Sequence, residues 1–163
     1  MCLGLFRRKS RTNQPIDKKD ILEMFGFLVE DYGLEYQLQK YRNCYGGGWY
    51  VEIHCFYNKN GCFSIYELGQ RDEWDYFFAP RYSEKMEELK AVRLDICAVE
   101  KELWKEPLKI IEEYNQKAIN YKTLGQLLNY AYSSQRLILE TLAKVIKVQI
   151  EKAGLFYGLK VEK

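Results

Sequence analysis

The sequence contains little proline, a single histidine and no long apolar run, and these shortages limit what the chain can be. Only 3 of its 163 residues are proline, and His54 is the one histidine. Its apolar runs are far shorter than the roughly 18 residues that a membrane-spanning helix requires. The short apolar start, residues 1–6, precedes the basic residues Arg7, Arg8, Lys9 and Arg11, whereas a signal peptide has the opposite order. We therefore expect a cytoplasmic protein without membrane insertion.

The cysteines show no pairing pattern. Their number is odd and no Cys-x-x-Cys spacing occurs among them: Cys2, Cys44, Cys55, Cys62 and Cys97. In a chain that is not secreted, this pattern predicts reduced thiols. A metal site combining His54 with these thiols is disfavoured, because adjacent residues of a strand point to opposite faces. We expect no metal and no cofactor.

The small net charge of +2 hides an uneven distribution along the chain. Residues 1–16 carry four basic groups and no acid, residues 17–106 carry 12 Lys and Arg against 18 Asp and Glu, and residues 107–163 carry 9 against 5. Positive charge is therefore not interleaved with the aromatic residues, as a nucleic-acid-binding surface requires. We expect no nucleic-acid partner, and an acidic, aromatic surface suits a basic protein partner better.

Aromatic residues are abundant, and between residues 49 and 78 they form three runs separated by turn residues. The runs 49–57, 62–68 and 74–78 predict antiparallel strands, and the alternation over 34–40 predicts a strand before them. Aromatic residues occupy both odd and even positions, so neither face of the sheet is plainly polar. We expect helices on one face and a partner on the other, with some of four side chains at least partly exposed: Tyr50, Phe56, Trp74 and Tyr76.

The turn at 58–61, Asn-Lys-Asn-Gly, is the strongest hairpin signal in the chain. Asn and Gly tolerate the positive φ that tight hairpins often need. A two-residue loop and a three-residue loop with a bulge both fit the sequence, and the choice sets the cross-strand pairs.

Helical periodicity surrounds this sheet. Apolar spacing predicts four helical segments: 17–32, 83–104, a segment that starts at Pro107, and 121–152. Asp17 is expected to cap the first of them and Gly33 to end it. Gly154 is expected to end the last. Residues 1–16 lack periodicity and predict a flexible basic tail, followed by a single domain over 17–163. The predicted fold is α+β: an N-terminal helix, a four-stranded antiparallel meander sheet, and two to three C-terminal helices packed on one sheet face.

His54 is the one candidate for acid–base catalysis. A catalytic histidine needs an orienting acid and a nucleophile or substrate proton nearby. Glu52 and Glu67 could orient it, but no nucleophile follows from the spacing. We therefore expect no catalytic residue and predict that His54→Ala leaves function largely intact. A small enzyme centred on His54 is the alternative.

A candidate partner-binding surface combines aromatic anchors with carboxylates that can steer a basic partner. Three carboxylates surround Trp74, and further aromatic residues flank the glycines at 46–48. A solvated strand edge is the plainer explanation of the same carboxylates. The predicted binding residues are Tyr45, Trp49, Tyr50, Asp72, Glu73, Trp74, Asp75 and Tyr76.

Three segments resemble the small immunity proteins of bacterial polymorphic-toxin systems: Trp49-Tyr50, the run 56–63 (Phe-Tyr-Asn-Lys-Asn-Gly-Cys-Phe) and Trp74-Asp75-Tyr76. The resemblance covers roughly residues 20–105. It implies a non-enzymatic protein that neutralises a cognate toxin, here a basic one, by occluding its active site. A structural or regulatory module that dimerises through its C-terminal helices is a further alternative, and the oligomeric state stays open.

Overall fold

The computed structural model describes six segments of the chain: residues 15–42, 50–67, 74–84, 99–118, 124–156 and 159–161. The predicted tail lies outside them except for Pro15 and Ile16. Four of the predicted binding residues also lie outside the described segments: Tyr45, Trp49, Asp72 and Glu73. For Tyr50 and Asp75 the structure describes the backbone but not the side chain. Most of the predicted helix 83–104 is likewise not described.

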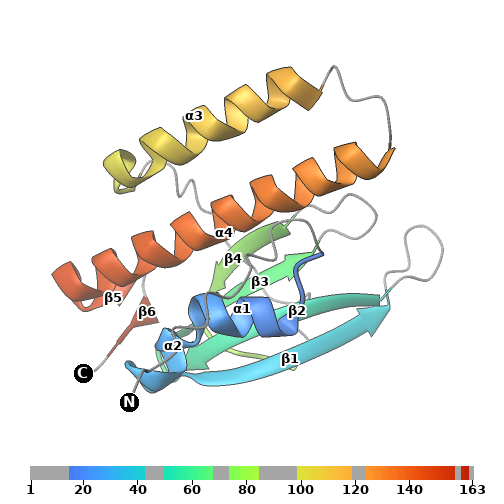
Figure 1. Cartoon of the computed structure of the whole chain (residues 1–163). Helices are drawn as coiled ribbons and strands as arrows, with labels where there is room; N and C mark the ends of the chain where they lie inside the picture. Colours follow the sequence, from blue (N-terminus) through green and yellow to red (C-terminus); the bar gives the residue numbers. More distant parts are fainter. Residues whose placement is uncertain are drawn as a thin grey trace, which may run out of the picture.

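Four strands form one antiparallel sheet in chain order (Figure 1), so the predicted α+β meander is confirmed. They are β1 (Glu35–Arg42), β2 (Tyr50–Asn58), β3 (Gly61–Glu67) and β4 (Trp74–Ala79). Phe56 lies opposite Tyr36 and Phe63, and Phe63 lies opposite Phe78. Because side chains of a strand alternate between faces, this register places one aromatic row on one face of the sheet.

The hairpin between β2 and β3 has a two-residue loop, because Asn58 pairs with Gly61. The predicted position is right, but the predicted positive φ is wrong, since none of these four residues adopts it. Instead the Asn60 N–H donates to Asn58 Oδ1 at 2.8 Å, an Asx turn. Gly61 is required for another reason: a Cβ there would lie 2.7 Å from Phe78 Cζ.

The N-terminal helix is divided in two at Gly26, into α1 (Lys18–Phe25) and α2 (Phe27–Glu30). Asp17 caps α1 as predicted, and its carboxylate and that of Asp20 accept each other's backbone N–H groups. Gly33, at φ +65°, ends this region as predicted. Ile16, which we expected in the tail, is buried in the core.

Two long helices follow the sheet, α3 (Lys101–Ala118) and α4 (Leu124–Ala153). The predicted helix 83–104 is wrong at both ends. Ser83 and Glu84, at its predicted start, are not helical. Near its predicted end, Glu100 has a left-handed backbone conformation, φ +50°, and a different helix, α3, begins at Lys101. The predicted restart at Pro107 is also wrong, because this proline lies inside α3. Proline removes one helical hydrogen bond, and the burial of Trp104 in the core offsets that loss.

The chain after α4 returns to the sheet. Gly154 ends α4 at φ +65° as predicted, and β5 (Leu155–Phe156) pairs with β6 (Leu159–Lys160). Leu159 is buried in the core, and the Lys160 carbonyl accepts 3.0 Å hydrogen bonds from two side chains of the β2–β3 turn, Asn58 and Asn60. The C-terminal segment is therefore fastened to this hairpin.

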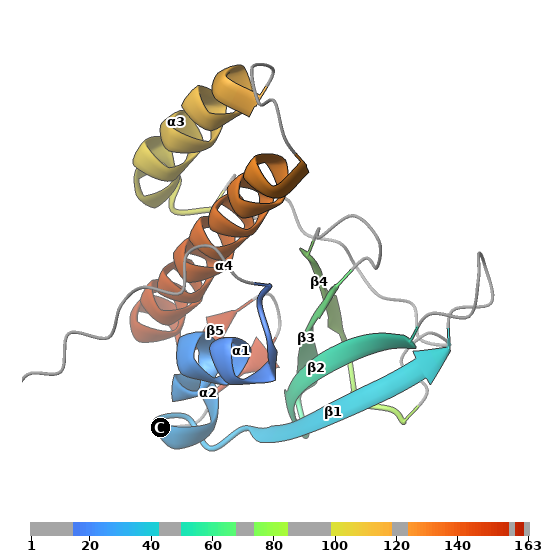
Figure 2. The same cartoon turned by 45° about the vertical axis from the view of Figure 1, so that its right-hand side comes forward.

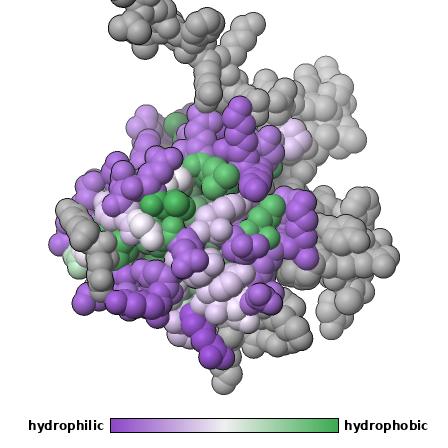
Figure 3. All heavy atoms as spheres, turned by 90° about the horizontal axis from the view of Figure 1, so that it is seen from below, coloured by the Kyte–Doolittle hydropathy of each residue, from purple (hydrophilic) through white to green (hydrophobic). Residues whose placement is uncertain are grey.

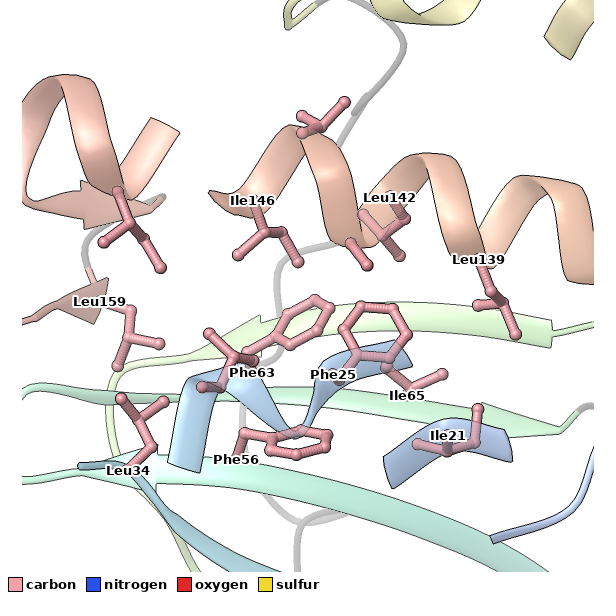
Figure 4. Packing of buried hydrophobic residues seen from close by; sticks show 14 of the residues in the cluster. Ile21, Phe25, Leu34, Phe56, Phe63, Ile65, Leu139, Leu142, Ile146 and Leu159 are labelled. Carbon is pink, nitrogen blue, oxygen red and sulfur yellow. The ribbon is translucent and has the colours of Figure 1, made fainter. Parts of the chain in front are cut away.

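One face of the twisted sheet carries the main core. Figures 1 and 2 show α1, α2 and α4 on the same side of the sheet, with α3 on the outer side of α4. Apolar side chains of α1 and α4 meet the aromatic row of β2 and β3 (Figure 4). The fully buried members of this cluster include Ile21, Phe25, Leu28, Phe56, Phe63, Ile65, Leu142 and Val145. Burial of apolar surface is the main favourable term in folding.

The second face of the sheet is covered at its centre. Its centre is buried, with Cys55, Cys62 and Ala79 fully covered. Residues 80–84, here called the strap, leave β4 and reach across the sheet to β1. The Tyr82 ring stacks on that of Tyr57 with centroids 4.0 Å apart, and Gln39 Nε2 donates to the Ser83 carbonyl at 2.6 Å. Aromatic residues on both faces therefore serve two packed layers within the described segments.

Candidate functional site

The two predicted binding residues whose side chains the structure describes lie side by side on the edge strand β4. Trp74 and Tyr76 are two residues apart, face the helix side of the sheet and are half-buried against the main core. Phe56, on the same face, is fully buried, whereas Trp74 and Tyr76 are partly exposed, as we expected of some of these side chains. Their place is different from the expected one, because they lie on the helix-covered face and not on the opposite face. The other predicted binding residues stay a prediction.

Trp74 is held at this edge from two sides. Its ring centroid lies 5.9 Å from that of His54, and its backbone N–H donates to Gln135 Oε1 of α4 at 3.4 Å. This environment fixes the ring while leaving part of it in contact with solvent. A fixed, partly exposed tryptophan matches the kind of anchor that protein interfaces favour.

His54 is buried behind this edge, 1% exposed, on the face that we expected from its place in the strand. Its Nδ1 is hydrogen-bonded to the Tyr36 hydroxyl at 2.9 Å. Burial lowers the pKa of His54 to about 4, although nearby Glu52 acts in the opposite direction. Burial likewise raises the pKa of Tyr36 to about 12. Both groups are therefore uncharged at neutral pH.

The acid that could have oriented His54 pairs with another residue. Glu52 lies 2.7 Å from Lys40 of β1 in a half-exposed ion pair. The side chain of the alternative acid, Glu67, is outside what the structure describes. A general base at neutral pH needs a pKa near the operating pH and access to the substrate proton. His54, buried and of low pKa, has neither property.

A second polar cluster, which the sequence analysis did not identify as a site, lies beneath the strap. Cys55, Cys62 and Ser64 are fully buried on the second face of the sheet. Cys62 Sγ lies 3.3 Å from Ser64 Oγ, and Cys55 Sγ donates to the Ile53 carbonyl at 3.9 Å. Neither of these two cysteines takes part in a disulfide. The sequence could have indicated this cluster through the hairpin register, because a two-residue loop places Cys55 opposite Ser64.

Among the residues that the structure describes, no group of three or more His, Cys, Asp and Glu side chains could hold a metal ion. None of the described helices combines the length and apolar character needed to cross a membrane.

A buried ion pair joins the N-terminal helix to α4. Arg136 Nη2 lies 2.8 Å from Asp20 Oδ1, and the Asp20 side chain is 3% exposed. Burial raises the pKa of Asp20, but the Arg136 guanidinium and the backbone N–H of Asp17 outweigh burial and hold that pKa below its usual value. The pair is placed to fix α1 against α4, and it is a structural contact.

The surface offers no broad apolar area on the side that Figure 3 presents, where small hydrophobic areas alternate with hydrophilic residues. Leu108 of α3, 45% exposed, is the single large exposed hydrophobic residue in the described part of the chain. Isolated exposed residues of this kind are normal on monomers. The described surface therefore favours polar and aromatic recognition over docking of an apolar partner face.

Comparison with known proteins gives no relative: no family model, no curated protein and no solved structure matches this chain.

Proposed function

We propose that this chain is a non-enzymatic, cytoplasmic binding protein that neutralises a cognate bacterial toxin by occluding its active site. The observation that carries the proposal is the half-buried pair Trp74 and Tyr76 on the edge strand, beside the carboxylates at 72, 73 and 75 in the sequence. Aromatic anchors at the centre with acidic residues around them suit a basic protein partner. The resemblance of three segments to immunity proteins agrees with this reading.

The state of His54 supports a binding role over an enzymatic one. The histidine is 1% exposed, its pKa is about 4, and its hydrogen-bond partner is a tyrosine whose own pKa is raised to about 12. Neither group supplies a base or a nucleophile at neutral pH. The His54 environment thus resembles a buried structural contact.

The experiment is co-expression in a bacterial host. The C-terminal domains of large secreted proteins encoded beside this gene are expressed with and without this chain, and growth is recorded. We expect one of these domains to stop growth and this chain to restore it, with a Trp74→Ala variant restoring growth less well. A Leu108→Ala variant, changed on the exposed side of α3, is the matched control and should restore growth fully.

The proposal is wrong if none of these domains is toxic, or if a toxic domain is unaffected by folded wild-type protein. A Trp74→Phe variant distinguishes loss of binding from loss of folding, because it retains an aromatic ring beside His54. The melting temperature of each variant completes this control.

A further inference from the structure

The strand β1 forms one edge of the sheet, and no strand among the described residues pairs with its outer side (Figures 1 and 2). It is eight residues long, and each of them has a partner in β2, so the strand contains no bulge. Natural proteins usually shorten, bend or cover such an edge, because its free N–H and C=O groups can pair with another chain. At the opposite edge, by contrast, Gln135 of α4 accepts from the Trp74 N–H of β4.

The hairpin register shows which backbone groups of β1 point outward. Asn58 and Gly61 flank a two-residue loop and form a hydrogen-bonded pair, and such pairs alternate along an antiparallel ladder. Tyr57, the next residue, therefore directs its N–H and C=O groups to β1, where it lies opposite Glu35. Every second residue of β1 from Glu35 onward pairs with β2 in this way. The residues between them direct their backbone groups away from the sheet: Tyr36, Leu38 and Lys40.

We propose that β1 pairs antiparallel with β1 of a second copy of this chain, so that the two sheets join across a two-fold axis at Leu38. In this register Leu38 lies opposite Leu38 of the second copy, and Tyr36 lies opposite Lys40. Each of these pairs exchanges both backbone hydrogen bonds. The inference does not depend on the proposed function, because β4, with Trp74, is the opposite edge of the sheet and stays accessible in both copies.

The side chains at these positions suit pairing with a copy of the same strand. On the helix side of the sheet, the half-buried Leu38 side chains would cover each other, and the exposed Lys40 would lie against the Tyr36 ring, a cation–π contact. On the other side, Gln37 would lie opposite Gln39. Like charges directly opposite each other would destabilise the pairing, and these pairs contain none. The two-fold axis repeats each favourable pair.

Charge complementarity also favours an antiparallel copy. Exposed carboxylates gather where the strand begins: Glu30, Asp31 and Glu35. The exposed Lys40 lies near its other end, so antiparallel pairing brings the acidic start of one strand beside the basic end of the other. Lys18 already lies over the Tyr36 ring, at 5.6 Å from its centroid, and Lys40 of the second copy would add a cation there. Glu52, which lies 2.7 Å from Lys40, neutralises this cation.

Analytical ultracentrifugation of the full chain at increasing concentration tests the self-association. We expect a dimer in equilibrium with the monomer. Lys40→Pro removes an N–H group that points outward, and an edge strand tolerates proline at such a position. The dissociation constant of the dimer should rise about 30-fold or more, because both copies lose a hydrogen bond.

Lys40→Thr is the matched control. It removes the same ion pair with Glu52 but retains the backbone N–H, so it should dimerise like the parent. Circular dichroism and the melting temperature verify that each variant is folded.

A cysteine at the two-fold axis tests the register. In Leu38→Cys the two introduced cysteines would have Cα atoms about 5.5 Å apart, within the range that a disulfide spans. Trypsin releases residues 20–40, which contain no native cysteine, so mild oxidation should yield a disulfide-linked dimer of this peptide. Glu35→Cys lies in the same peptide and is the control. Its two copies would lie about 20 Å apart along the strands and should not be linked.

Three results would overturn the proposal. The first is a monomer at every concentration, which would leave this edge to a strand of another protein. The second is equal dimerisation of folded Lys40→Pro and Lys40→Thr. The third is linkage in Glu35→Cys that is as efficient as in Leu38→Cys, and this comparison decides the question if Lys40→Pro does not fold.

Discussion

His54 loses its contact with water when the chain folds, and this loss should make stability depend on pH. Its pKa falls from 6.5 to about 4 in the folded protein. Below about pH 6.5 the unfolded chain therefore binds a proton that the folded chain does not yet accept. The free energy of unfolding should be highest above that pH and should decrease by up to about 3 kcal/mol as the pH falls towards about 4.

The measurement is urea unfolding at several pH values between about 4 and about 7. His54→Gln, which offers the Tyr36 hydroxyl an amide partner, should lose this part of the pH dependence while retaining the part from other groups. Identical pH profiles for the parent and the variant would contradict the assigned burial of His54.

The Asp20–Arg136 ion pair permits a second prediction for single residues. Arg136→Met leaves the Asp20 carboxylate, 3% exposed, without its counter-ion. We expect a loss of about 3–5 kcal/mol in the free energy of unfolding at neutral pH. The loss should shrink at acid pH, because the variant's Asp20 takes up a proton more readily.

Lys105→Met is the matched control for this pair. It breaks the ion pair between Lys105 and Glu102, which are separated by 2.6 Å but are 69% and 80% exposed. Exposed pairs contribute little, so we expect a change below about 1 kcal/mol. Equal losses in the two variants, measured by chemical unfolding, would show that the Asp20 pair has no special role.

Among the structural elements, the β2–β3 hairpin depends on a close approach at its turn. Gly61→Ala places a methyl group against the Phe78 ring, since a Cβ there would lie 2.7 Å from Phe78 Cζ. We expect a loss of about 1–3 kcal/mol in the free energy of unfolding from this overpacking. In the background of Phe78→Leu, the same change should cost less, and a double-mutant cycle of urea unfolding measures the difference. A coupling of zero would argue against the ring contact.

The strands and the residues that begin or end helices could be predicted from the sequence, because these features depend on neighbouring residues. Period-two alternation predicted β1, and aromatic runs bounded by turn residues predicted β2, β3 and β4. Asp17, Gly33 and Gly154 act where predicted because capping and left-handed conformation are local properties. The location of the hairpin followed from Asn58 to Gly61, although its backbone conformation did not.

Other elements could not be predicted because long-range packing decides them. Pro107 signals a helix start by local rules, yet α3 continues through it where Trp104 is buried. The strap has no periodicity, and its role depends on contacts of Tyr82 and Ser83 with distant strands. Because these long-range contacts of the strap are not visible in the sequence, the second face of the sheet was expected to be free for a partner.

The candidate site was predictable only in part. The sequence placed His54 and Phe56 on one face correctly, but it could not indicate that both side chains are buried, Phe56 against Phe25 of α1 and His54 between Tyr36 and Trp74. Trp74 and Tyr76 were selected as aromatic anchors, and their half-buried position depends on where β4 meets Gln135 of α4. Periodicity identifies a face, whereas the depth of a residue depends on the layer above it.

For the molecule as a whole, the proposed interface predicts distinct kinetic effects for charge and for ring contacts. Changing the carboxylates Asp72, Glu73 and Asp75 to Lys should lower the association rate with a toxin domain identified by co-expression about tenfold at low salt and reduce its salt dependence. Trp74→Ala should mainly accelerate dissociation, by about 30-fold if the residue is an anchor. Surface plasmon resonance measures both rates, and Leu108→Ala is the control.

Melting curves must accompany these kinetics because Trp74 also packs against His54. If the charge reversal leaves association unchanged at every salt concentration, the acidic segment takes no part in binding.

The proposed function requires stoichiometric neutralisation, and titration of the toxin's activity measures this stoichiometry. A fixed amount of the purified toxin domain that the co-expression experiment identifies is mixed with increasing amounts of this protein, and the remaining toxin activity is measured. We expect a linear decrease that reaches zero at one equivalent, because each protein molecule would occlude one active site. Full activity at excess protein would contradict binding, and complete inactivation by a small fraction of an equivalent would contradict a mechanism without turnover.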